Sequence, residues 1–129
     1  MAIFKTVVRV VFAAFFIVAG VTHFTNRAFF LAIVPPYLPW HEALVSVSGV
    51  AEILLGGLLL LPSSSHLAGW GLIALLIAVF PANIHMLVHH ELYPTTSLTA
   101  LWIRVPLQGV MIAIAYWFAR KESPAHKPL

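Results

Sequence analysis

The chain has 129 residues, of which 61% are hydrophobic and only 9% are charged. A soluble domain normally carries about 25% charged residues, so this composition excludes an ordinary soluble protein and predicts a membrane protein. The formal net charge of +3 does not indicate a nucleic-acid-binding protein, because five of the seven Lys and Arg residues gather at the chain ends: Lys5, Arg9, Arg120, Lys121 and Lys127. The absence of cysteine excludes disulfides, thiol nucleophiles and cysteine-ligated iron–sulfur clusters.

Four apolar segments are long enough to cross a bilayer, at roughly 3–24, 41–61, 66–88 and 98–119. A spanning helix needs about 20 residues, and a helix satisfies its own backbone hydrogen bonds in lipid. The sequence therefore predicts an all-α, integral membrane four-helix bundle that forms a single domain over residues 1–129. The first segment has a basic start like that of a signal peptide, but no clean small-x-small cleavage site follows it, so we expect an uncleaved helix.

The distribution of basic residues predicts the orientation. The loops near 27–40 and 89–97 carry a single Arg, whereas both chain ends are basic. By the positive-inside rule we expect both termini on the cytoplasmic side, and an even number of spans agrees with this.

The connector after the first span is apolar but too short to cross the bilayer. Its prolines at 35, 36 and 39 exclude a regular helix there, since each one removes a donor and restrains the preceding residue. Tyr37 and Trp40 are suited to anchoring it at the membrane interface. Two interpretations stay open, an apolar connector or a lid over the outer mouth of the bundle.

Prolines also lie inside the third and fourth spans, at Pro81 and Pro106. A proline is a common cause of a kink in a helix, and broken membrane helices are tolerated where they line cavities or are buried in protein. We therefore expect both helices to be kinked.

Glu52 is the only carboxylate in the stretch Ser46–Leu61, with roughly ten almost purely apolar residues on either side. An unpaired carboxylate at the bilayer centre costs about 3 kcal/mol, so we expect Glu52 to be protonated or to face a partner within the bundle. Arg104 is the only basic residue set well inside another apolar segment, which predicts an ion pair with Glu52. Gly49 and Gly56 share the helix face of Glu52 and predict close approach of a neighbouring helix.

Counting residues along each span places a polar group from each of the four helices in the outer half of the bundle. The predicted cluster comprises Glu52, Arg104, Gln108, Asn83 and His23. It has two interpretations: polar contacts that fix the helix register, or the floor of an outward-opening cavity that orients a carbonyl or hydroxyl head group.

His85 and His89 stand four residues apart, a spacing that puts two imidazoles on one helix face and suits a divalent metal. Interfacial histidines at a helix end are the alternative. A nucleophilic triad has no support, because the chain contains no aspartate and Ser63–Ser65 has the pattern of a turn.

Short motifs along almost the whole chain resemble those of DoxX-like small membrane proteins. They are Gly20-x-x-His23-Phe24, Phe29-Phe30-x-x-Ile33-Val34-Pro35-Pro36-Tyr37-Leu38-Pro39, Ser48-Gly49-x-Ala51-Glu52, Trp70-Gly71-Leu72, Phe80-Pro81-Ala82-Asn83-Ile84 and Leu101-Trp102-x-Arg104-x-Pro106-Leu107-Gln108. The resemblance implies four transmembrane helices in a bacterial cytoplasmic (inner) membrane. Some DoxX-type proteins are membrane subunits of quinone-linked oxidoreductases, and the resemblance covers all five residues of the predicted cluster but not His85 or His89.

We therefore expect a multi-pass protein of the lipid bilayer whose polar cluster lines a pocket for a small amphiphile, such as a quinone or an isoprenoid, in a membrane subunit that serves a redox partner protein. A structural or accessory protein is the first alternative. A metal-handling protein using His85 and His89 is the second. The sequence leaves open whether the protein is an enzyme and whether it forms a homo-oligomer, and no nucleic-acid partner is expected.

Overall fold

The computed structural model describes residues 2–94 and 96–120, and this part of the chain contains helices and no strand. In chain order the elements are α1 (Ala2–Thr25), α2 (Arg27–Ile33), α3 (His41–Leu60), α4 (Ser65–Val88), the 3-10 helix η1 (His90–Leu92) and α5 (Leu98–Ala119). By length and composition, α1, α3, α4 and α5 could each cross a membrane. The predicted all-α bundle of four candidate spans is confirmed, and each long helix begins and ends within one residue of its expected range.

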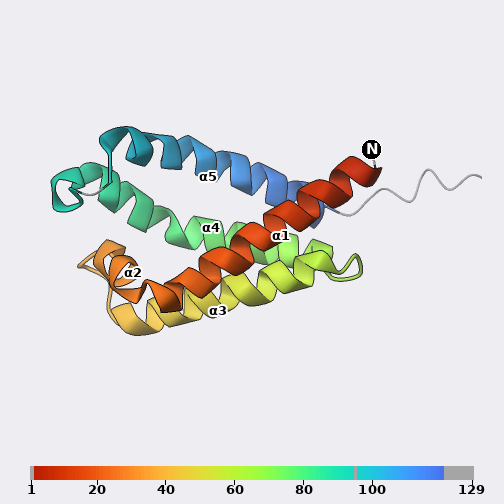
Figure 1. The fold of residues 1–129 in the computed structure, drawn as a ribbon, viewed down its shortest axis with the longest axis horizontal. Helices are drawn as coiled ribbons and strands as arrows, with labels where there is room; N and C mark the ends of the chain where they lie inside the picture. Colours follow the sequence, from red (N-terminus) through yellow and green to blue (C-terminus); the bar gives the residue numbers. More distant parts are fainter. Residues whose placement is uncertain (1, 95, 121–129) are drawn as a thin grey trace, which may run out of the picture.

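The long helices run antiparallel in chain order (Figure 1). The start of α1, the turn between α3 and α4, and the end of α5 lie at one end of the molecule, which we call the terminal end. The segment around α2, the start of α3 and η1 lie at the opposite end, which we call the loop end. The start of the first span and the end of the last therefore lie on the same side of the bundle.

Glycine brings α1 and α3 close together. A Cβ placed on Gly20 would lie 2.6 Å from the carbonyl oxygen of Gly49, and one on Gly56 would lie 2.9 Å from the carbonyl oxygen of Ala13. Real Cβ atoms do not approach backbone this closely, so only glycine fits at these positions. The prediction that Gly49 and Gly56 admit a neighbouring helix is confirmed, and that helix is α1.

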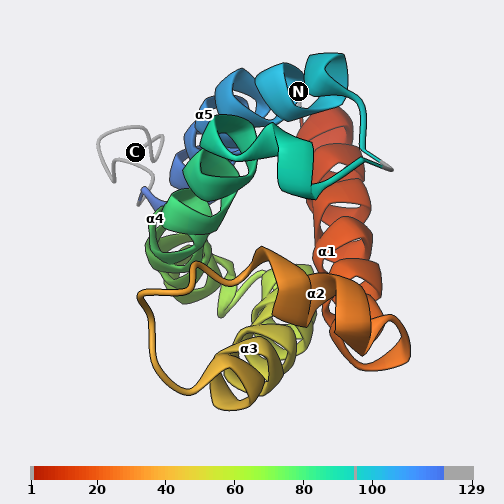
Figure 2. The same ribbon diagram turned by 90° about the vertical axis from the view of Figure 1, so that its left-hand side faces the viewer.

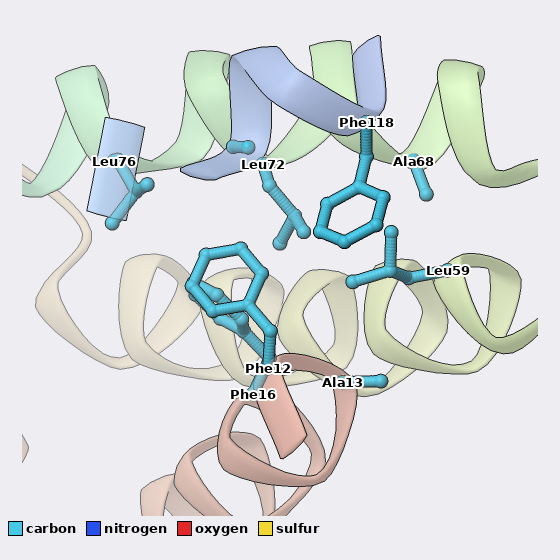
Figure 3. Close-up of a cluster of buried hydrophobic side chains, with 9 residues drawn as sticks. Phe12, Ala13, Phe16, Leu59, Ala68, Leu72, Leu76 and Phe118 are labelled. Carbon is cyan, nitrogen blue, oxygen red and sulfur yellow. The ribbon is translucent and has the colours of Figure 1, made fainter. Parts of the chain in front are cut away.

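The main apolar core lies toward the terminal end, where all four long helices contribute (Figure 3). Its buried members are Phe12, Ala13, Phe16, Leu59, Ala68, Leu72, Leu76, Ala115 and Phe118. The rings of Phe12 and Phe16 meet edge to face, with centroids 4.9 Å apart, which is a favoured aromatic geometry. The polar residues of the predicted cluster lie outside this apolar core.

The outward faces of the long helices are apolar as well. Side chains such as Phe15, Val47, Leu54 and Ile77 are more than half exposed in the isolated chain. A helix that is hydrophobic all round requires an apolar surrounding, which a bilayer supplies. The fold therefore agrees with a multi-pass membrane protein.

The connector contains a helix that the sequence did not predict. Residues Arg27–Ile33 form α2, which contacts α1, α3 and α4 at the loop end. It ends at Ile33, and the next residue, Val34, has an extended backbone (φ −66°, ψ 126°), as a residue before proline favours. The prolines thus exclude helix after Val34, as expected, but they do not prevent one before it.

Candidate functional site

The predicted ion pair between Glu52 and Arg104 is wrong. In the described residues no ion pair joins the two side chains, and the basic neighbour of Glu52 is His23 on α1. The reason is the helix arrangement: α3 packs against α1 and α4, while the main neighbour of α5 is α4. Figure 2 shows α3 and α5 on opposite sides of the bundle.

His23 and Glu52 form the first polar pair, almost buried between α1 and α3. The Nδ1 atom of His23 lies 3.2 Å from Oε2 of Glu52, and the side chains are 9% and 12% exposed. Nδ1 donates its proton to the carbonyl oxygen of Ala19 at 2.8 Å, so the contact with Glu52 is an approach without hydrogen-bond geometry. The imidazole also stacks on the ring of Phe30 from α2, with centroids 3.9 Å apart. The pair is therefore covered by α2, and Oε2 of Glu52 is a buried oxygen without a hydrogen bond.

Asn83 and Gln108 form the second pair, between α4 and α5. The Asn83 amide donates to Oε1 of Gln108 at 2.5 Å, and the Gln108 amide donates to the backbone carbonyl of Leu76. Gln108 is only 3% exposed, and both ends of its amide are satisfied by α4. This pair has the geometry of a contact that fixes the register of two helices.

Arg104 lies one turn before Gln108 on α5 and is half-buried. It makes no ion pair or hydrogen bond with a described residue. The predicted cluster thus separates into two pairs on different helix pairs and an arginine that joins neither.

A cavity of about 300 Å³ opens at the loop end, and we call it the loop-end pocket. It is lined by Tyr37, Pro81, Ile84, His85, Val88 and His89. Apolar side chains thus form much of its wall, and two imidazoles and one phenol supply the polar groups. Ligand sites commonly combine a mostly apolar wall with a few polar groups that fix orientation.

The two aromatic residues of the proposed lid, Tyr37 and Trp40, differ in whether they line the loop-end pocket. Tyr37 lines the loop-end pocket although 70% of it is exposed, whereas Trp40 is 78% exposed and is not among the lining residues. Trp40 instead takes the left-handed backbone conformation (φ 55°) directly before α3.

The two histidines of the metal hypothesis do lie together. The rings of His85 and His89 have centroids 4.7 Å apart, and Glu91 approaches His89 to 3.8 Å. Within the described chain, however, no group of three or more His, Cys, Asp or Glu side chains could hold a metal ion. Catalytic and structural zinc sites use at least three protein ligands, so the geometry does not strengthen the metal hypothesis.

The sequence did not predict the loop-end pocket, although four of its lining residues were singled out: Tyr37, Pro81, His85 and His89. Pro81 and His85 lie four residues apart on one face of α4, and His89 follows at the same interval as the C-cap residue of the helix. That stripe was a usable signal. The spacing could not predict that Tyr37 joins the pocket, because the position of Tyr37 depends on how the proline-rich segment folds back against α4.

The fold agrees with a multi-pass α-helical membrane protein, with a partly polar pocket at its loop end. Over residues 12–119 the chain matches the model of a family described as a domain of unknown function, DUF8561, and the protein belongs to this family. No curated protein and no solved structure matches the chain.

Proposed function

We propose that the protein binds the head group of a small amphiphile in the loop-end pocket, as the membrane subunit of an oxidoreductase system. The amphiphile carries a carbonyl or hydroxyl group, as a quinone or an isoprenoid alcohol does. The observation that carries this proposal is the combination of an apolar wall with His85, His89 and Tyr37 in one open cavity.

The size and chemistry of the pocket support a head group rather than a whole lipid. A volume of about 300 Å³ is at the small end of ligand pockets, and it suits one ring with its substituents. A neutral imidazole both donates and accepts a hydrogen bond, and a phenol can donate one, so these groups can orient a carbonyl or a hydroxyl. The tail of the amphiphile would remain along the apolar outer faces of the helices.

The redox assignment rests on the resemblance to DoxX-like proteins. The chain contains no cysteine, so dithiol chemistry is excluded and a partner protein would exchange the electrons. The chain's own part is then to bind and orient the amphiphile. We further propose a bacterial inner membrane, with the terminal end on the cytoplasmic side because of its basic residues.

Pro81 has a place in this proposal because it lies in the pocket wall. Proline lacks the amide hydrogen that would bond to the carbonyl of Ile77, one turn earlier. We propose that α4 is kinked there, which opens its outer half, and that Pro106 acts similarly on α5.

A structural or accessory role is the second candidate, and the bonds of Gln108 favour it. Its amide is fully used between α4 and α5, so this part of the predicted cluster needs no ligand. The loop-end pocket lies outside the contact of Gln108 with α4. A measurement of ligand binding therefore distinguishes the two candidate functions.

The test is equilibrium binding of a radiolabelled short-chain quinone to the purified protein in nanodiscs. Tyr37→Ala and His85→Leu should each weaken binding about tenfold, the effect of one lost hydrogen bond with its packing. Trp40→Ala, at another exposed aromatic residue, and His66→Leu, at another histidine, are controls outside the pocket, and they should leave affinity unchanged. Equal effects in both sets, or no saturable binding, would overturn the proposal.

A further inference from the structure

A second cavity lies at the terminal end, where α1 begins, α3 turns into α4, and α5 ends. Its volume is about 540 Å³. It is lined by Ala2, Lys5, Thr6, Arg9, Pro62, Ser65, His66, Phe118 and Arg120. We call it the terminal-end cavity, and neither the proposed function nor the polar pairs use it.

The lining of the terminal-end cavity is strongly basic. Lys5, Arg9 and Arg120 carry positive charges, His66 adds an imidazole, and no described lining residue is acidic. A cavity lined by charges of one sign has a positive potential, which attracts an anion. The hydroxyl group of Thr6 adds a donor for such an anion, whereas that of Ser65 donates to the carbonyl oxygen of Pro62.

Lys5 is oriented by its aromatic neighbours. Its ammonium group lies 5.5 Å from the ring centroid of Trp117 and 5.7 Å from that of Phe118, which are cation–π distances. Phe118 also belongs to the cavity wall, so the basic groups stand directly beside an apolar surface.

A second observation, independent of the charge of the lining, concerns Arg9. Its Nε atom is buried and makes no hydrogen bond to any residue that the structure describes. A buried guanidinium nitrogen without an acceptor is costly, because its loss of water is not compensated. An oxyanion is the natural acceptor, since a guanidinium binds phosphate oxygens through two parallel hydrogen bonds.

We propose that the terminal-end cavity binds the phosphate head group of an anionic phospholipid. Basic pockets between transmembrane helices at the cytoplasmic surface are suited to such head groups. A lipid is favoured over a free phosphate ion because Phe118 and Pro62 give the cavity apolar walls, and because Ile3 and Phe4 expose an apolar surface at the same helix end. The glycerol and the acyl chains can lie along that surface. The proposal of a lipid site does not depend on the proposed binding of an amphiphile in the loop-end pocket.

The test uses native mass spectrometry of the full chain, delipidated in detergent and titrated with phosphatidylglycerol or with phosphatidylcholine of the same acyl chains. Phosphatidylglycerol should be retained at least several-fold better. Arg9→Gln should weaken its retention about tenfold, because one charge-assisted contact is lost. Arg27→Gln is the matched control, since Arg27 lies at the loop end and bonds to Ser46 and to the carbonyl of Glu42.

A second variant and two competing anions complete the test. Arg120→Gln repeats the test at a residue near the end of α5, so the proposal stays testable if Arg9→Gln does not fold. Inorganic phosphate and glycerol phosphate should not displace the lipid at equal concentration. Displacement by either, equal retention of the two lipids, or an equal effect of Arg27→Gln would overturn the proposal.

Discussion

Gly20→Ala is the substitution whose effect the structure defines most sharply. The added Cβ would lie 2.6 Å from the carbonyl oxygen of Gly49 and 2.7 Å from Cγ1 of Ile53. The isoleucine atom can rotate away, but the carbonyl belongs to the backbone of α3. The two helices must therefore separate at their closest approach.

The magnitude follows from a comparison with Gly57→Ala, where no atom lies within 4 Å of the added Cβ. Both glycines are inside long helices, so the gain in helix propensity is similar and cancels in the difference. Overpacking a well-packed contact costs about 1–3 kcal/mol. We expect Gly20→Ala to be less stable than Gly57→Ala by this amount.

The assay is equilibrium unfolding in mixed micelles with increasing SDS, monitored by helical circular dichroism. Gly109→Ala is a second control, because its Cβ also meets open space. Equal stability of Gly20→Ala and both controls would refute the close packing of α1 on α3.

Three further predictions concern single polar groups. Gln108→Leu should lower stability by about 1 kcal/mol in the same assay, because it leaves the Asn83 amide without its partner, and it should not change quinone affinity. Glu52→Gln should leave stability unchanged or slightly higher, since Oε2 has no hydrogen bond to lose, and a loss above about 1 kcal/mol would contradict this. Burial raises the pKa of Tyr93 above its usual value of 10.0, so the folded state keeps the phenolic proton to higher pH than the unfolded state. The contribution of Tyr93 to stability is therefore fully present below pH 10 and is lost as pH rises through the raised pKa. Tyr93→Phe should flatten this alkaline fall in melting temperature, and an unchanged fall would contradict the assignment.

The spans were predictable because their signal is local. Length and hydropathy define a membrane helix from its own residues, and α3, α4 and α5 follow the expected ranges closely. The helix α2 was not predicted, because the whole connector was interpreted from the prolines that follow α2. A proline restricts the residues beside it and one turn before it, and the seven residues of α2 could still form a helix.

The partner of Glu52 was not predictable from depth alone. Counting residues assumes parallel helices, whereas α1 crosses α3 obliquely, which carries His23 toward the middle of α3 (Figure 1). A better signal was present in the sequence. Gly20 precedes His23 by three residues and Gly49 precedes Glu52 by three, so each polar side chain shares a face with a glycine. Two such faces suit each other in close packing, and in the structure they meet.

The central claim is that an amphiphile binds beside α4 at the loop end, and photolabelling tests it most directly. A photoreactive quinone analogue is cross-linked to the protein in nanodiscs, and the labelled residues are located by peptide mass spectrometry. We predict labels at Tyr37 and within Pro81–His89 that an excess of unlabelled quinone suppresses. Labels concentrated around Glu52 or Arg104, or spread evenly over the lipid-facing surfaces and unaffected by competitor, would contradict the claim.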